Sequence, residues 1–134
     1  NVQITGDLIV DNIQIDGNTI SAESGVVTLA NGANNNVASP GRSFIRITGP
    51  TGVFNITGFT APIKSPVTNP DGTVLIVYNS TSQNMTITND SSSSTAANRI
   101  LTNTGSDVAT TGTGVIICIY SVTDSRWIMI SSLT

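Results

Sequence analysis

Residues Gly114–Ser132 contain the pattern that most constrains the fold of this chain. Two apolar runs, Val115–Tyr120 and Trp127–Ile130, flank a polar segment that includes Thr123-Asp124-Ser125. β-Branched residues at this density on both sides of a short polar turn predict a β-hairpin. The first run does not alternate, so it sends apolar side chains to both faces of its strand. Such a strand is expected to be buried on both faces, which requires a second layer of cover.

The composition favours an all-β chain. Only 10% of the 134 residues are charged, and asparagine, serine, threonine and glycine supply most of the polar surface. Few lysines and glutamates together with many β-branched residues argue against helices. Because 38% of the residues are hydrophobic, the low charge does not indicate disorder. This length suits one modest domain, or a small domain with an extension.

Charge and cysteine content exclude several classes of function. The net charge is −3, and the basic residues are too scattered along the sequence to predict nucleic-acid binding. No apolar segment reaches the roughly 18 residues of a membrane span, so no membrane insertion is expected. The single cysteine, Cys118, excludes an intrachain disulfide and is expected to be a buried small hydrophobic residue. The basic residues are Arg42, Arg46, Lys64, Arg99 and Arg126.

The first 30 residues have the pattern of a fibre repeat. Short apolar stretches are separated by turn residues such as Asp16-Gly17-Asn18, and they carry too few large side chains to form a core within one chain. Such a segment is stable if it winds with copies of itself. The polar stretch Asn31–Pro40 is interpreted as a linker. We therefore predict a short intertwined β-repeat stalk over residues 1–35 and a globular domain over residues 36–134.

The globular part is predicted to be a β-sandwich or jelly-roll-like knob, because short strands are separated by long polar loops. Gly49-Pro50-Thr51-Gly52 is a strong turn signal that is consistent with a hairpin. The longest loops are expected at Phe59–Pro70, Ser91–Asn98 and Thr104–Thr113. The predicted strands are Ser43–Thr48, Val53–Thr57, Thr73–Asn79, Met85–Asn89, Ile100–Thr102, Val115–Tyr120 and Trp127–Ser131.

Several predicted strands carry apolar residues on both faces, which predicts that subunits associate. A sandwich buries only one face of each sheet, and no helix is expected that could cover the other. We assign Leu75, Val77, Ile116 and Cys118 to the outward face and predict that they form a subunit interface in an obligate homo-oligomer. Burying each such side chain contributes roughly 1.5–3 kcal/mol. The alternative is a monomer whose loops fold over one sheet.

No motif predicts catalysis, a metal or a cofactor. The chain has no histidine, which excludes Ser-His-Asp and Cys-His catalysis and a histidine-based metal site. Asp7, Asp11 and Asp16 could form a carboxylate pair for glycoside hydrolysis, but turn positions already explain them. Asp16 or Asp124 could bind Ca²⁺, although neither lies in a complete calcium loop. Trp127 and Tyr120 could stack on a sugar ring, and the place of Trp127 beside an apolar strand favours core packing.

Two blocks of sequence resemble bacteriophage tail fibres and related virion fibre proteins. The first is GDLIVDNIQIDGNTISAESGVVTL at residues 6–29, which resembles the D-N-I-x-I-x-G-N-T-I repeats of these fibres. The second spans residues 72–132 and resembles a C-terminal β domain found in such proteins. Its recurring elements are a strand that ends in asparagine, an N-R-I segment and a Y…D…R-W hairpin, here Asn79, Asn98–Ile100, Tyr120, Asp124 and Arg126-Trp127.

This resemblance implies a homotrimeric structural protein of a virion that mediates attachment to the host through its knob. Its expected partners are other virion proteins at the N-terminal end and a host-surface glycan or outer-membrane receptor. An alternative is a head fibre or capsid decoration protein without a receptor role, and a third is a carbohydrate-active enzyme. The loops place the candidate surface-binding residues at Phe59, Lys64, Asn69, Ser93, Asn98 and Asp107.

Overall fold

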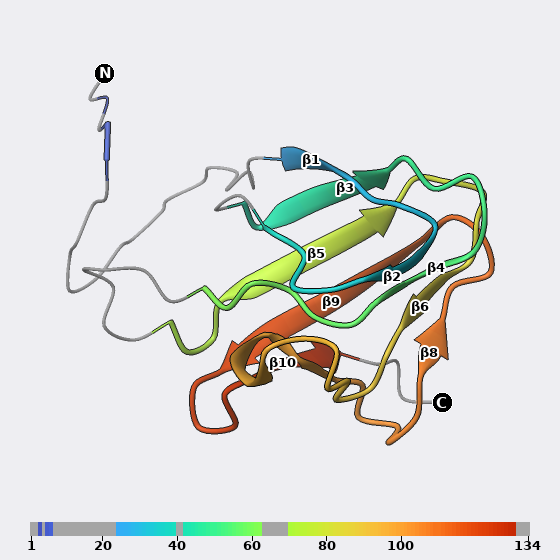
Figure 1. The fold of residues 1–134 in the computed structure, drawn as a ribbon. Coiled ribbons are helices and arrows are strands. Elements are labelled where there is room, and N and C mark those ends of the chain that lie inside the picture. The colour runs from blue at the N-terminus through green and yellow to red at the C-terminus, as the bar shows by residue number, and fades with distance from the viewer. Residues whose placement is uncertain (1–2, 4, 7–23, 40–41, 63–69, 131–134) are drawn as a thin grey trace.

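The computed structural model describes residues 3, 5–6, 24–39, 42–62 and 70–130, and these residues form two β-sheets (Figure 1). The larger sheet has six strands in the order β1-β3-β5-β9-β10-β7, and the smaller has four in the order β2-β4-β6-β8. Within these ranges the one helix is a 3-10 turn, η1 (Ala96–Asn98). The all-β class is therefore confirmed. The strands are β1 (Ser24–Thr28), β2 (Gly32–Asn34), β3 (Phe44–Thr48), β4 (Phe54–Ile56), β5 (Val74–Asn79), β6 (Met85–Ile87), β7 (Ile100–Leu101), β8 (Val108–Ala109), β9 (Gly114–Ser121) and β10 (Arg126–Ile130).

The first six strands form three coils, each with one strand in the larger sheet and the next strand in the smaller sheet. The coils are β1–β2, β3–β4 and β5–β6, and strands of successive coils pair in parallel in both sheets. Strand β9 then pairs antiparallel with β5, and β10 pairs antiparallel with β9. The C-terminal hairpin thus extends the larger sheet beyond the third coil.

The parallel coils correct two sequence-based expectations. A jelly roll is built from antiparallel strands, so the predicted jelly-roll connectivity is wrong, although two packed sheets are present. The expected hairpin at Gly49–Gly52 is also wrong, because β3 and β4 lie in different sheets. Gly49 has a φ of +104°, and a Cβ there would lie 2.4 Å from the carbonyl oxygen of Leu29. This corner therefore packs against the corner of the first coil and carries the chain from one sheet to the other.

The core lies between the two sheets. Alternate side chains of the larger sheet, including Ile45, Val77 and Cys118, are buried together with Phe54 and Met85 of the smaller sheet. Parallel pairing in register aligns these positions, since Ile45 is opposite Val77 and Val77 is opposite Ile116. One strand face from each sheet thus fills a single apolar layer.

Trp127 lies at the centre of an aromatic cluster within this core. Its ring makes edge-to-face contacts with Tyr120 at a centroid distance of 5.2 Å and with Phe59 at 6.3 Å. Its indole Nε1–H donates a hydrogen bond of 2.9 Å to the carbonyl oxygen of Phe59. The indole is therefore buried with its donor satisfied, which confirms the core-packing interpretation of Trp127.

The predicted C-terminal hairpin is confirmed, but its predicted burial on both faces is wrong within the chain. Strands β9 and β10 pair in antiparallel register. The first pair is Ser121 with Arg126, and the last is Ile117 with Ile130. Cys118 and Tyr120 of β9 point into the core, whereas Val115 on the opposite face is 56% exposed. The smaller sheet covers only the first of these faces.

The predicted boundary between stalk and knob needs correction at its C-terminal side. Strands β1 and β2 pair with β3 and β4, so residues 24–34 belong to the same sheets as the proposed knob. The stretch Asn31–Pro40 is wrong as a linker, because it contains β2 and Val37, which forms an isolated bridge with Phe59. Most of residues 1–23 lie outside the described residues, so the stalk prediction stays a prediction for them.

Asparagine side chains hold the corners where the strand ladders are interrupted. The Asn31 Oδ1 accepts hydrogen bonds from the backbone N–H groups of Thr51 and Gly52, at 2.9 and 3.0 Å. These contacts tie the first corner to the second. The buried Asn79 Nδ2 donates to the carbonyl oxygens of Gln83 at 2.8 Å and Gly112 at 3.0 Å. Side-chain amides thus pair backbone groups that sheet pairing leaves unmatched.

The buried side chain of Asn79 provides a test of this arrangement. Asn79→Ala should lower the free energy of unfolding by about 2 kcal/mol or more, because it removes a buried amide that donates to two carbonyl groups and accepts from the Thr81 backbone N–H and hydroxyl. Asn55→Ala is the matched control, since the Asn55 amide has one long bond of 3.5 Å to Thr88. Urea denaturation measures both. Equal midpoints for the two variants would contradict the role assigned to Asn79.

Candidate functional site

Three consecutive loops meet at one end of the smaller sheet, which we call the loop end and define as residues 35–38, 58–61 and 91–98. They follow β2, β4 and β6 and lie side by side (Figure 1). Backbone hydrogen bonds join them: Val37 donates to Gly58 at 2.8 Å, Thr60 donates to Val37 at 2.9 Å, and Phe59 donates to Asn98 at 2.9 Å. The loops therefore continue the parallel order of the coils and form one joined surface.

Asn36 links the first loop to the third. Its Oδ1 accepts hydrogen bonds from the Thr95 backbone N–H at 2.8 Å and from the Asn98 Nδ2 at 2.9 Å. Its own backbone N–H donates to the Ser94 Oγ at 2.9 Å. Beneath this contact the Ser94 and Thr57 hydroxyl groups are 2.7 Å apart and buried. These bonds join the segments around Asn36, Thr57 and Ser94, which lie far apart in the sequence.

Gly58 permits the close approach of these loops. A Cβ at this position would lie 2.5 Å from the carbonyl oxygen of Asn98 and 2.7 Å from the Ser94 Oγ. Neither distance leaves room for a side chain. The middle loop can therefore lie this close to the third loop only if position 58 is glycine.

The structure brings several predicted binding residues to this end of the sheet. Ser93 is exposed within the third loop, and Asn98 is half-buried there, where its Oδ1 accepts a hydrogen bond of 2.8 Å from the Ala61 backbone N–H. Asp107 is exposed just before β8, and its Oδ1 accepts a bond of 2.9 Å from the Asn89 backbone N–H. Because β8 runs antiparallel to β6, Asp107 lies at the same end as the loop that follows β6.

Phe59 is wrong as a surface-binding residue. Its side chain is fully buried, because its ring packs against Trp127 of the larger sheet. Lys64 and Asn69, the other two predicted binding residues, lie outside the described residues.

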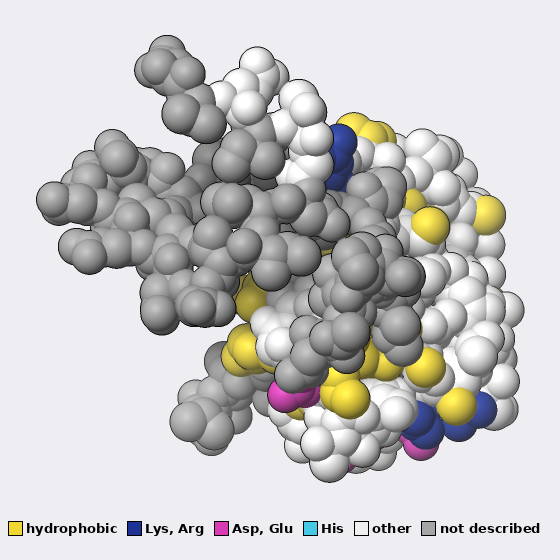
Figure 2. All heavy atoms as spheres, turned by 90° about the vertical axis from the view of Figure 1, so that its left-hand side faces the viewer, with side chains coloured by type: hydrophobic (Ala, Val, Ile, Leu, Met, Phe, Trp, Pro, Cys, Tyr) yellow, Lys and Arg dark blue, Asp and Glu magenta, His cyan; other side chains and the backbone are white. Residues whose placement is uncertain are grey.

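A small charged cluster lies near the loop end. The Asp90 carboxylate is 2.8 Å from the Arg126 Nε and 3.8 Å from the Arg99 Nη1. Two of the five basic residues thus come together, although the sequence did not indicate a cluster. Partly exposed pairs of this kind contribute at most about 1 kcal/mol. On the side shown in Figure 2 the described surface is mostly uncharged, with charged side chains in small groups.

The predicted interface residues lie in the core of the chain. Leu75, Val77, Ile116 and Cys118 are all buried between the sheets, so their assignment to a subunit interface is wrong. Side chains of the opposite parity point away from the smaller sheet, and we call them the outer face of the larger sheet. Its exposed apolar members are Val26, Val74, Val115, Ile117 and Ile130.

Two titratable side chains of the core are unsuited to catalysis. Burial raises the pKa of the Cys118 thiol to about 12, so this cysteine is not a nucleophile at neutral pH. Burial also raises the pKa of Tyr120, an effect that the nearby Arg126 guanidinium partly opposes. The Tyr120 hydroxyl donates a hydrogen bond of 3.2 Å to the carbonyl oxygen of Ala97. Both groups therefore stabilise the fold in their neutral forms.

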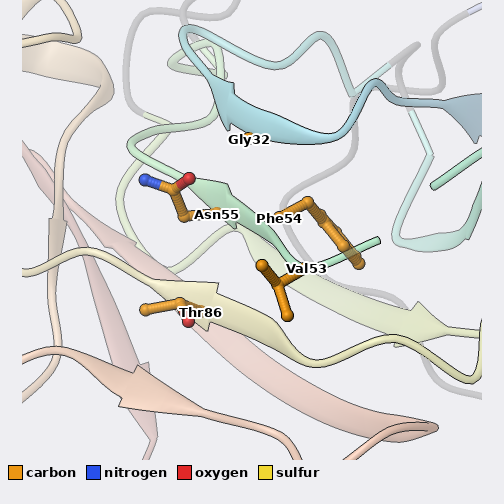
Figure 3. A pocket seen from close by; sticks show the side chains of 5 residues that line it. All are labelled: Gly32, Val53, Phe54, Asn55 and Thr86. Atoms are coloured by element: carbon orange, nitrogen blue, oxygen red, sulfur yellow. The ribbon is translucent and has the colours of Figure 1, made fainter. Parts of the chain in front are cut away.

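A shallow depression lies on the outside of the smaller sheet (Figure 3). Its volume is about 180 Å³, and its walls come from Gly32, Val53, Phe54, Asn55 and Thr86. The polar side chains among these are one amide and one hydroxyl, and none of the five titrates. The depression can contact a small uncharged molecule but offers no acid, base or nucleophile.

The described part of the chain shows neither a metal site nor a membrane helix. In these residues no group of three or more histidine, cysteine, aspartate or glutamate side chains could hold a metal ion. No helix within the described ranges is long and apolar enough to span a membrane.

Comparison of the chain with protein-family models, with curated proteins and with solved structures finds no match.

Two sequence signals indicate features that the predictions above did not include. Arg46 lies between Ile45 and Ile47 in the sequence. It therefore indicates which side of its strand faces solvent and which alternate residues face the core. Extending that parity through parallel pairing places Val77 in the core. The run of asparagines at residues 34–36 indicates corner positions that need side-chain hydrogen bonds, rather than a linker.

The Cys118 thiol tests the core assignment. Native protein should not react with a thiol reagent at pH 8, whereas unfolded protein should react at once, because only the thiolate attacks. A thiol whose pKa is raised by folding stabilises the native state below its unfolded pKa, near 9.0. That stability should fall as the pH rises from about 9 to about 12. Rapid labelling of native protein would contradict burial of this face of β9.

Proposed function

We propose that this chain is a structural subunit of a virion fibre that attaches the particle to a host-cell surface through the loop end. The observation that carries this proposal is the joining of three loops at one end of a two-sheet body. The Asn36 contacts to Thr95 and Asn98 hold these loops in fixed positions. A binding surface on a rigid scaffold loses little conformational entropy when it meets a ligand.

The chemistry of the loop end suits a polyhydroxylated ligand. Thr60, Ser93 and Thr95 are exposed there, and they present hydroxyl groups without a formal charge. Such groups exchange hydrogen bonds with sugar hydroxyls, which supports a host-surface glycan as the ligand class. Individual contacts of this kind are weak, so attachment requires several copies that bind together.

We further propose that the chain assembles as a homotrimer within the virion. The exposed apolar side chains of the outer face support self-association, because a contiguous apolar sheet face favours removal from water. Three copies present three loop ends, which raises the effective concentration of a weak contact. Other virion proteins are the proposed partners at the N-terminal end.

The purified chain should have a mass in solution three times its 13.8 kDa chain mass. Light scattering coupled to gel filtration at micromolar concentration measures this mass directly. A stable species of one chain would contradict the homotrimer.

Attachment can be tested with a matched pair of variants at opposite ends of the smaller sheet. Ser93→Arg should reduce binding of the labelled protein to susceptible bacterial cells at least tenfold, because a long charged side chain obstructs the loop end. Thr111→Arg places the same side chain at an exposed position near the other end and should bind as the wild type does. Flow cytometry over a panel of bacterial strains and a glycan array provide the two readouts.

If Ser93→Arg and Thr111→Arg reduced binding equally, the loop end would not be the contact surface. Wild-type protein that binds no strain and no glycan would overturn the attachment role. A head fibre or capsid decoration protein without receptor binding would then be the better description.

A further inference from the structure

We propose that the outer face of the six-stranded sheet is the surface through which copies of this chain associate, an inference that rests on the proposed homotrimer and assigns its interface. The face is opposite to the one that the smaller sheet covers. Val26 on β1 is 66% exposed and Val115 on β9 is 56% exposed. These values mark apolar side chains that the described fold leaves in contact with water.

The exposed valines are the two ends of one row across four strands. Pairing in register aligns Val26 with Arg46, Arg46 with Tyr78, and Tyr78 with Val115. The Arg46 Cζ lies 4.8 Å from the centroid of the Tyr78 ring, and the Phe44 ring stacks on Tyr78 at 6.5 Å. Tyrosine, phenylalanine and arginine are enriched at the centres of protein interfaces, where they supply most of the binding energy.

The neighbouring row is apolar. Ile76 aligns with Ile117, and Ile117 aligns with Ile130. Ile117 and Ile130 are exposed, and Ile76 is half-buried. The β1 members of the two adjacent rows are Val26 and Ser24. On β3, β5, β9 and β10 the two rows form a continuous strip whose side chains are apolar or aromatic except for Arg46.

The charge of the face agrees with another copy of the chain as its occupant. Among the described residues of these two rows, Arg46 is the one that carries a charge. Its guanidinium lies over the Tyr78 ring. The rows carry no carboxylate that would select a basic partner. If three copies turn this face toward a common threefold axis, each strip contacts those of the other two copies, and no copy brings an unpaired acidic group into the contact.

The size of the face agrees with this assignment. Five strands about 4.8 Å apart, each contributing four residues at about 3.3 Å per residue, give a strip on the order of 300 Å² in projection. An interface of standard size buries roughly 800 Å² per partner, with an apolar centre and a polar rim. The outer face has the size of such a centre, and the hydrogen-bonded hydroxyls of Thr28 and Thr48 lie at its border.

A matched pair of valine substitutions tests the interface. The trimer of the Val115→Glu variant should have a dissociation constant at least 100-fold higher than that of the wild-type trimer, because its interface would bury an unpaired carboxylate. Val53→Glu introduces the same group at a valine that is 70% exposed near the smaller sheet and should leave the trimer unchanged. Sedimentation equilibrium gives the masses, and protection of Cys118 from a thiol reagent shows that each variant is folded.

Val26→Glu on the edge strand is a second test in case Val115→Glu does not fold, and it should also dissociate the trimer. An oligomer that persists in both folded variants would overturn this interface and leave the proposed homotrimer standing. A wild-type chain that sediments as a single copy would overturn both proposals. Dissociation by Val53→Glu alone would move the interface to the smaller sheet.

Discussion

Backbone pairing between successive coils is the interaction on which the rest of the structure depends. Each coil crosses from one sheet to the other at a corner, where its peptide groups lose their strand partners. Asparagine side chains replace those partners at Asn31, Asn34 and Asn79, and threonine hydroxyls assist them. An amide can both donate to a carbonyl group and accept from an N–H group, so it can replace either kind of missing strand partner without adding a charge. This use of amides and hydroxyls agrees with a chain that is rich in asparagine and threonine and poor in lysine and glutamate.

The coil arrangement also separates the two surfaces that the proposals use. One face of each sheet packs into the common core. The apolar residues on the other face of the larger sheet therefore point outward. The loops that leave the smaller sheet gather at its end, away from that face, and Asn36 joins them there. A subunit built in this way can bury its side against other copies and still present its loops to a host surface.

Much of the strand pattern could be predicted from local sequence, but the face and the partner of each strand could not. Turn residues delimit β3 to β7, β9 and β10 closely, and the hairpin around Thr123-Asp124-Ser125 follows from its short polar turn. In Val115–Tyr120 both parities are apolar, so periodicity cannot say which side chains enter the core. Phe59 was expected in a loop because prolines follow it, whereas its burial depends on Trp127, 68 residues away in the chain.

The sequence by itself determined that this protein is all-β, that its C-terminal apolar runs form a hairpin, and that it lacks the residues of a histidine-dependent catalytic site. These properties depend on side-chain chemistry and on neighbours within a few residues. Only the tertiary structure decided that the strands wind as parallel coils, that Cys118 faces inward while Val115 faces outward, and that three distant loops share one surface. Those outcomes depend on pairing between segments that lie 20 or more residues apart, where backbone register rather than local preference selects the partner.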